Sequence, residues 1–107
     1  MKYRVLLTHE ARKDLLDIHS YVADADDATK ADALLDNLER VCARLSYLPQ
    51  KGHVPPELRR IGVELYREIH YKPYRILYEV EGDAVYVHAI LDGRRDMQPL
   101  LERRLLR

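Results

Sequence analysis

The residues best suited to chemistry in this sequence are the arginines of its second half. Residues 49–107 contain 11 basic side chains against 9 acidic ones, and nine of the basic side chains are arginine. A guanidinium group binds phosphate or carboxylate through a planar pair of N–H donors, which lysine lacks. Its pKa lies above ~12, so it stabilises negative charge without transferring protons near neutral pH. Proton transfer would have to fall to His70, His88 or a tyrosine such as Tyr71 or Tyr74.

An ordinary surface of ion pairs explains the same arginines. The whole chain has no formal net charge, with 18 Lys and Arg against 18 Asp and Glu. Arg75 could pair with Glu68 or Glu79 on neighbouring strands, and His88 could be a structural residue of a strand. The types of residue alone leave both interpretations open.

Other signatures of catalysis are absent from the sequence. It has no glycine-rich phosphate loop, no Gly-x-Ser-x-Gly and no His-Glu-x-x-His. A single cysteine, Cys42, excludes an internal disulfide and any cage made only of cysteines. The five histidines lack the spacing of metal ligands unless folding brings them together: His9, His19, His53, His70 and His88. We therefore expect neither a cofactor nor a metal.

The first half of the chain predicts a short strand over residues 3–8 and then two helices. Thr8 is suited to cap the first helix, whose apolar stripe recurs at spacings of 4, 3 and 4: Ala11, Leu15, Ile18 and Val22. Residues 24–27 favour a turn. The second helix is expected over 28–48, with Pro49 ending it and a stripe formed by Leu34, Leu38, Val41, Leu45 and Leu48. Cys42 lies beside this stripe and is expected to be a small buried residue.

In the second half of the chain, apolar residues recur at every second position. Residues 50–62 predict a loop, because the pair Pro55-Pro56 resists both helix and central strand. Three strands follow in an antiparallel meander, over 64–71, 74–81 and 84–91. The tail, 94–107, is either a short helix or a flexible arm, and Pro99 leaves both possible.

This order of elements predicts one α+β domain over residues 1–107. A helical hairpin, at about 8–48, should pack on one face of a four-stranded, mostly antiparallel sheet that includes the N-terminal strand and the segment 64–91. The other face would remain open to water or to a partner.

Alternation along the strands predicts which side chains lie on each face. The apolar sets should lie under the helices: Ile76, Tyr78, Val80, Val85, Val87, Ala89 and Leu91. Arg75, Tyr86 and His88 would then share the open face, with Arg94 and Arg95 at its edge. Arg67 is ambiguous, since it would point inward and need a carboxylate partner if Leu65 and Ile69 point inward.

Length and composition set the class of protein. At 107 residues with 47% hydrophobic side chains, the chain can build one core. Its longest aliphatic runs are a few residues, so no membrane span or secretory signal is expected, and we expect a cytoplasmic protein.

The sequence resembles the RelE/ParE superfamily of toxins from bacterial type II toxin–antitoxin systems. The resemblance covers nearly the whole chain and begins with LTHEARKDL at residues 7–15. Its most specific parts are YREI, PYRILYEV and ILDGRRD at residues 66–69, 73–80 and 90–96. The resemblance implies the fold derived above, and a cognate antitoxin whose disordered tail folds onto the toxin in a hetero-oligomer.

The superfamily divides by target. RelE-like members cut mRNA on the ribosome without metal, and the resemblance would then give catalytic roles to Arg67, Arg75 and Arg95, with His88 as a candidate for proton transfer. Two departures weaken this: Ile69 stands where a second Lys is expected, and the tail from residue 97 has no Tyr.

ParE-like members, which inhibit DNA gyrase by binding it, resemble the chain better at residues 92–96 and in the hairpin. We therefore favour a gyrase inhibitor whose target-binding residues are Arg94, Arg95 and Arg75. The alternatives are the ribosome-dependent endonuclease and an inactive relic that only binds its antitoxin.

Overall fold

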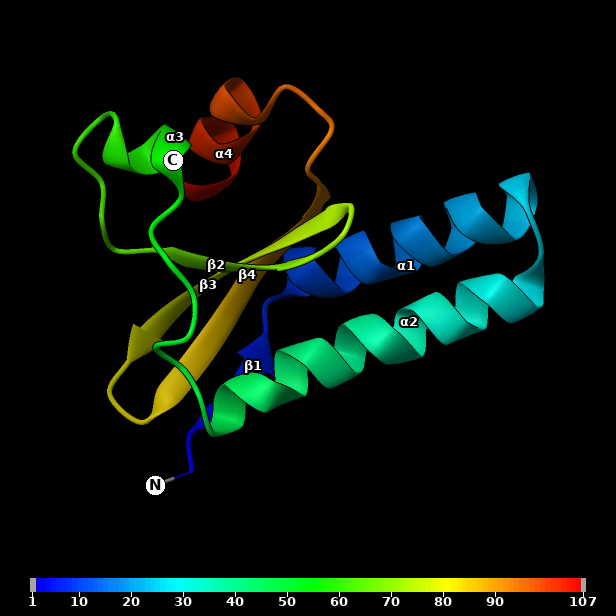
Figure 1. The fold of residues 1–107 in the computed structure, drawn as a ribbon, viewed down its shortest axis with the longest axis horizontal. Helices are drawn as coiled ribbons and strands as arrows, with labels where there is room; N and C mark the ends of the chain where they lie inside the picture. The colour runs from blue at the N-terminus through cyan, green and yellow to red at the C-terminus, as the bar shows by residue number, and fades with distance from the viewer. Residues whose placement is uncertain (1, 107) are drawn as a thin grey trace.

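The computed structural model describes residues 2–106, which form a four-stranded sheet with helices on both faces (Figure 1). The elements in chain order are β1 (Arg4–Leu7), α1 (His9–Ala25), α2 (Ala28–Ala43), the 3-10 turn η1 (Arg44–Ser46), α3 (Pro56–Arg59), β2 (Arg67–Tyr71), β3 (Tyr74–Glu81), β4 (Ala84–Asp92) and α4 (Met97–Leu105). The strands lie in the order β1-β4-β3-β2, with β1 parallel to β4 and the other pairs antiparallel. The predicted α+β fold is confirmed. Among residues 2–106, no helix has the length and apolar character needed to cross a bilayer.

The hairpin of α1 and α2 begins as the sequence predicts. The hydroxyl of Thr8 accepts a hydrogen bond from the backbone N–H of Ala11 at 3.1 Å and caps α1. The carboxylate of Asp27 caps α2 in the same way, accepting from the N–H of Lys30 at 2.8 Å. The turn between the helices is shorter than expected, because α1 continues to Ala25.

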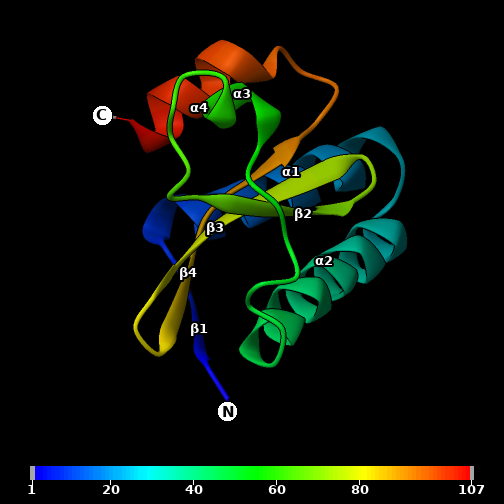
Figure 2. The ribbon, with the colours of Figure 1, turned by 60° about the vertical axis from the view of Figure 1, so that its left-hand side comes forward.

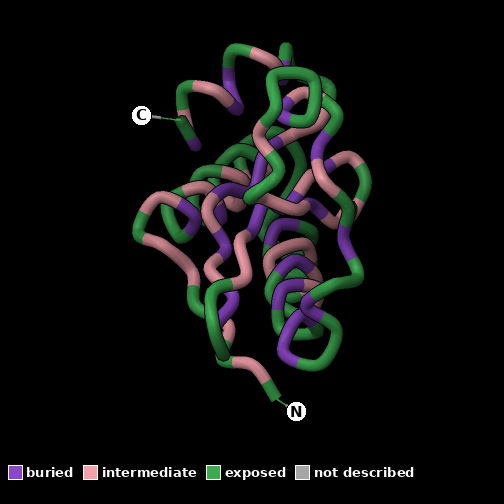
Figure 3. The backbone as a smooth tube through the Cα atoms, turned by 90° about the vertical axis from the view of Figure 1, so that its left-hand side faces the viewer, coloured by how far each residue is buried: buried purple, intermediate pink, exposed green. Residues whose placement is uncertain are grey.

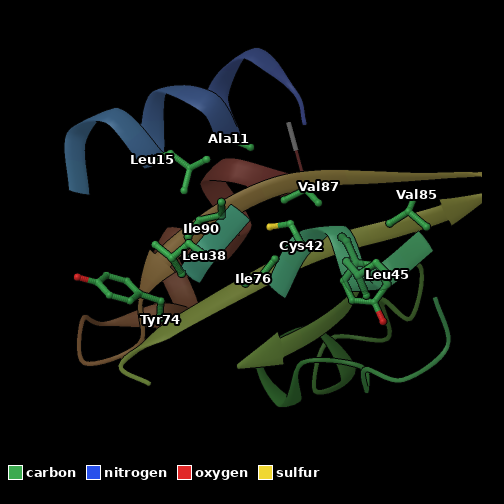
Figure 4. Packing of buried hydrophobic residues seen from close by; sticks show 11 residues of the cluster. Ala11, Leu15, Leu38, Cys42, Leu45, Tyr74, Ile76, Val85, Val87 and Ile90 are labelled. Atoms are coloured by element: carbon green, nitrogen blue, oxygen red, sulfur yellow. The ribbon is translucent and has the colours of Figure 1, made fainter. Parts of the chain in front are cut away.

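One face of this hairpin packs on the sheet and forms the larger core. Its buried members are Ala11, Leu15, Leu38, Cys42, Leu45, Tyr74, Ile76, Tyr78, Val85, Val87 and Ile90 (Figure 4). Buried and exposed positions alternate along the helices, as expected for helices with one face on a core (Figure 3). The predicted stripe fails at its end: α2 stops at Ala43, and Leu48 is 55% exposed.

A β-bulge in β4 changes which residues face the hairpin. Leu77 pairs with Ala89 but Tyr78 pairs with Val87, which leaves His88 as an extra residue on β4. The bulge reverses the alternation, so Ala89 and Leu91 face away from the hairpin and Ile90 faces it. The prediction that Val85, Val87, Ala89 and Leu91 share one face under the helices is therefore wrong beyond Val87.

The opposite face of the sheet is not open around Leu77. Helices α3 and α4 cover it there and form a second core (Figures 1 and 2). Its buried members are Leu58, Leu77, Ala89, Leu91, Met97, Leu100, Leu101 and Leu105. The expectation of an uncovered face is wrong for this part of the sheet.

Prolines did not prevent these two helices. Pro56 is the first residue of α3 and Pro99 lies in the first turn of α4, where backbone N–H groups have no partner within the helix. The tail is therefore a packed helix, and the segment 50–62 contains a helical turn that the sequence analysis assigned to a loop.

Side chains close the edge of β4 where β1 ends. Strand β1 pairs with β4 only as far as Val87. Beyond it, the N–H of Ile90 donates to the carboxylate of Asp14 at 2.9 Å, and the carbonyl of His88 accepts from Arg104 at 3.1 Å. Arg104 also pairs with Asp14, at 2.9 Å. The pair Asp14–Arg104 thus satisfies the backbone groups that β1 leaves uncovered.

The burial of Cys42 predicts an unreactive thiol. Cys42 is 2% exposed. Its burial, with a smaller contribution from Glu39, raises the pKa of its thiol to about 12. Because the thiolate is the reactive form, we expect the native protein to react with a chromogenic disulfide at pH 8 at least about 100-fold more slowly than the unfolded chain. Reaction at equal rates with and without denaturant would contradict this burial.

Candidate functional site

Arg75 lies in a network of ion pairs between β3, β2 and α3. Its Nε donates to Glu68 at 2.5 Å, and its two terminal nitrogens donate to the carboxylate of Glu57 at 2.8 and 2.7 Å. The side chains of Arg75 and Glu68 are 13% and 1% exposed. Hydrogen bonds from Arg75 are the main cause of a lowered pKa at Glu57, and hydrogen bonds to Glu57 are the main cause of a raised pKa at Arg75.

For Arg75, this network supports the interpretation that the arginine forms ordinary ion pairs. The pairing of Arg75 with Glu68 is confirmed, whereas its availability at an uncovered face is not. Glu57 was missed, because the segment containing it was expected to be a loop. The guanidinium of Arg75 is occupied on both its edges and holds α3 against the sheet.

Arg67 lies on the other face of the sheet from Arg75. It pairs in register with Tyr78, and its Nη1 donates to the backbone carbonyl of Gly52 at 2.6 Å, so its partner is a carbonyl rather than the expected carboxylate. The hydroxyl of Tyr78 donates to the carbonyl of Pro49 at 2.8 Å and accepts from the N–H of Gly52 at 2.9 Å. A Cβ at Gly52 would collide with the backbone carbonyl of Glu68, so only glycine fits there. Arg67 and Tyr78 together anchor this loop.

His88 is held by its neighbours at the bulge. Its Nε2 lies 2.9 Å from a carboxylate oxygen of Glu79, and its ring meets Tyr66 edge-on at 5.5 Å between centroids. Among the contacts of residues 2–106, His88 shares no partner with Arg67 or Arg75. The residues proposed for RNA cleavage therefore do not form one constellation.

Arg94 and Arg95 lie at the exposed turn that follows β4. The Nε and Nη2 of Arg94 donate to the carboxylate of Asp92 at 3.0 and 2.6 Å, yet the Arg94 side chain is 75% exposed. These hydrogen bonds lower the pKa of Asp92 to about 2. Arg95 is also exposed. Unlike Arg75, both arginines can be reached by a macromolecule.

A hollow of about 320 Å³ lies beside this turn, between α1 and the ends of β3 and β4. It is lined by Asp14, Asp17, Ile18, Tyr21, Tyr74, Ile90, Leu91, Asp92, Arg94 and Arg95. Tyr21 is 72% exposed, whereas Tyr74 is largely buried and its pKa is raised by that burial. A tyrosine with a raised pKa stays protonated near neutral pH. This surface, which we call the arginine corner, therefore offers guanidinium and aromatic contacts and is suited to binding.

A second hollow of about 410 Å³ lies between the end of α2 and the edge strand β2. Cationic side chains line it from three positions, Arg40, Arg44 and Lys51. Apolar side chains line it from Val41, Leu45, Leu48, Ile69 and Tyr71, and the lining also includes Asn37, Gly52, His53, Glu68 and His70. This α2–β2 groove would suit a segment that carries both acidic and apolar residues.

Comparisons with known proteins agree with one another. The family model described as "ParE toxin of type II toxin-antitoxin system, parDE" matches residues 5–97. Toxin ParE3 from Caulobacter vibrioides is 33% identical over 94 residues, which cover 88% of this chain and 90% of that protein.

Solved structures show the same fold. A chain of the chromosomal ParDE TA system from P. aeruginosa is similar with a TM-score of 0.71 and 18% identity, covering 83% of this chain and 94% of that one. A chain of the RelBE2 toxin–antitoxin complex from Mycobacterium tuberculosis is similar with a TM-score of 0.64 and 18% identity, covering 86% and 92%.

Proposed function

Because this chain belongs to the ParE toxin family of type II toxin–antitoxin systems, we propose that it inhibits growth by binding DNA gyrase through the arginine corner. A cognate antitoxin neutralises it. The observation that carries this proposal is the exposure of Arg94 and Arg95 beside Tyr21, on the turn between β4 and α4. Exposed arginine and tyrosine are the residue types that contribute most to protein interfaces. Arg75, which the sequence analysis included, has no part in this surface.

Several contacts favour binding over RNA cleavage. A ribosome-dependent nuclease needs charge stabilisation and proton transfer at one place. Here Arg75 is occupied by two carboxylates, Arg67 by a carbonyl on the other face, and His88 by Glu79. Helices α3 and α4 also cover the part of the sheet around Leu77.

The antitoxin is proposed to occupy the α2–β2 groove. Strand β2 is an edge of the sheet where the loop pairs at His53 opposite Glu68, so an extended segment could pair with it beyond that bridge, and the exposed Leu48 offers an apolar contact beside it. Arg40, Arg44 and Lys51 give the groove a positive charge that suits an acidic segment. Because this groove and the arginine corner have different linings, an antitoxin segment in the groove could leave the corner accessible.

The double variant Arg94→Ala/Arg95→Ala tests the proposal. We expect it to raise the concentration needed for half-inhibition of purified gyrase at least about tenfold, because loss of interface arginines commonly reduces binding by 1 kcal/mol or more. Supercoiling of a relaxed plasmid is the measurement. The matched control is Arg59→Ala/Arg60→Ala, a pair of adjacent arginines that is also exposed, at the end of α3.

Three results would contradict the proposal in different ways. Equal inhibition by the two double variants would place the gyrase contact elsewhere. A wild-type chain that leaves gyrase unaffected but depletes mRNA on translating ribosomes would be a nuclease. A chain with neither activity and no effect on growth would be an antitoxin-binding relic.

A further inference from the structure

Folding brings two histidines and a buried carboxylate together in the lining of the α2–β2 groove. The Nε2 of His53 lies 3.0 Å from Oε2 of Glu68, and the Nε2 of His70 lies 3.3 Å from Oε1 of the same residue. One ligand atom from each of the three residues lies within 4.8 Å of the others. We propose that His53, Glu68 and His70 bind a divalent transition-metal cation of the Zn²⁺ class.

Backbone contacts hold these three residues together without a metal. Glu68 and His70 are two residues apart on β2, so their side chains leave the same face of the strand. His53 is fixed opposite Glu68 by a pair of backbone hydrogen bonds, of 3.1 Å from its own N–H and 2.8 Å to its carbonyl. Tyr78 and Arg67 anchor the same loop at Gly52. The cluster therefore rests on a rigid frame, as a preformed site requires.

The ion-pair network of Arg75, Glu57 and Glu68 has more negative than positive charge, which favours binding of a cation. Arg75 carries one positive charge against the two carboxylates of Glu57 and Glu68, so the network has a net negative charge while the imidazoles are neutral. Glu68 is 1% exposed, and a buried carboxylate is stable only with enough positive partners. Among residues 2–106, its ion-pair partners are Arg75, His53 and His70. Two of these three are imidazoles, whose ring nitrogens are ligands for a metal ion, and a metal ion there would add positive charge beside the buried carboxylate.

The ligand atoms also have the right spacing. Metal bonds of about 2.0–2.2 Å to nitrogen and oxygen place neighbouring ligands about 3.0–3.4 Å apart, at angles between octahedral and tetrahedral. The two N–O distances, 3.0 and 3.3 Å, run to different oxygens of the Glu68 carboxylate, and one ligand atom from each residue lies within 4.8 Å of the others. The imidazole side chains are 59% and 46% exposed, so solvent leaves them room to turn toward one ion. The exposed side would hold water as the remaining ligand.

The donor types define the class of metal. Imidazole nitrogen with one carboxylate oxygen suits Zn²⁺, Ni²⁺, Co²⁺ or Cu²⁺, whereas Mg²⁺ and Ca²⁺ prefer sites made of oxygen. The other cations near the cluster lie in the neighbouring hollows: Arg40, Arg44, Lys51, Lys72 and Arg94. The Arg75 hydrogen bond to Glu68 is expected to persist and to orient the carboxylate, as supporting groups do around metal ligands.

Calorimetric titration of the full chain with ZnCl2, after removal of any affinity histidines, tests this site. We expect one equivalent to bind, and His53→Ala and His70→Ala each to weaken binding at least about tenfold. Both histidines are exposed, so the variants should fold. The matched control is His19→Ala, because His19 has a similar carboxylate contact, 2.7 Å to Asp32, but no third ligand.

The Glu68 carboxylate is left unchanged in these variants because Arg75 depends on it. As a second readout, Zn²⁺ should shift the imidazole NMR signals of His53 and His70 and leave those of His9 unchanged. Absence of binding at about 100 μM Zn²⁺ would overturn the proposal, as would equal loss of affinity in His19→Ala. Gyrase plays no part in this measurement, so its outcome is independent of the proposed function.

Discussion

Replacing Arg75 by alanine is expected to lower the free energy of unfolding by about 3–5 kcal/mol. The substitution leaves the carboxylates of Glu57 and Glu68 without their guanidinium partner, and Glu68 is 1% exposed. Removing one member of a buried ion pair has effects of about this size, because the remaining charge is buried and uncompensated. Urea unfolding followed by circular dichroism measures the change, and Arg59→Ala, an exposed arginine, is the control.

A second variant separates the loss of stability caused by uncompensated charge from the loss caused by the missing side chain. Arg75→Leu/Glu57→Gln/Glu68→Gln removes the stranded charges as well as the guanidinium, and we expect it to recover more than half of the lost stability. If Arg75→Ala were as stable as Arg59→Ala, the network would not support the fold. Loss of toxicity in Arg75→Ala should therefore be read first as unfolding.

The same network determines how the wild type responds to acid. Arg75 lowers the pKa of Glu57 in the folded state below its usual 4.5. The stabilising contribution of Glu57 is then complete above its unfolded pKa and is lost as the pH falls through the lower folded value. Stability measured between pH 6 and pH 3 should therefore fall more steeply in the wild type than in Glu57→Gln.

Replacing Leu101 by alanine is the second change with a large expected effect. Leu101 is 0% exposed in the core formed by α3, α4 and the sheet. Removing its side chain should lower the free energy of unfolding by about 2–5 kcal/mol through lost burial and the resulting cavity. The same urea titration is the measurement.

Leu106→Ala is the control at the end of the same helix, since Leu106 is 39% exposed. We expect it to change stability by less than about 1 kcal/mol. Equal effects of the two substitutions would mean that α4 is peripheral and that the sheet can be uncovered at little cost.

Local signals in the sequence were sufficient for much of the fold. Strand β3 has the predicted bounds, 74–81, because its alternation and its flanking turns are regular. Thr8 caps α1 as expected because the cap depends only on neighbouring residues. The hairpin and its position on the sheet follow from such signals.

The failures have tertiary causes. The run of three apolar residues from Ala89 to Leu91 does not by itself indicate a bulge, yet the bulge at His88 sends Ala89 and Leu91 to the other face. On that face, the leucines of α4 pack against these two side chains. That cover brings Glu57 of α3 to Arg75, which removes Arg75 from the candidate site.

The candidate site was therefore only partly predictable. Arg94 and Arg95 lie in the charged turn that follows β4, so their exposure could be anticipated. The pairing of His53 with Glu68 joins a loop to a strand across 15 residues, and no periodicity encodes such a contact. The spacing of Glu68 and His70 on one strand was the available signal.

The pair Asp14–Arg104 has a consequence for self-association. An unpaired strand edge can form hydrogen bonds with a strand of another polypeptide, and proteins that expose such an edge tend to polymerise. Here a carboxylate and a guanidinium occupy the amide positions beyond Val87, so an incoming polypeptide would have to displace both charges. An incoming polypeptide is thereby kept from this part of β4, which limits fibre growth there.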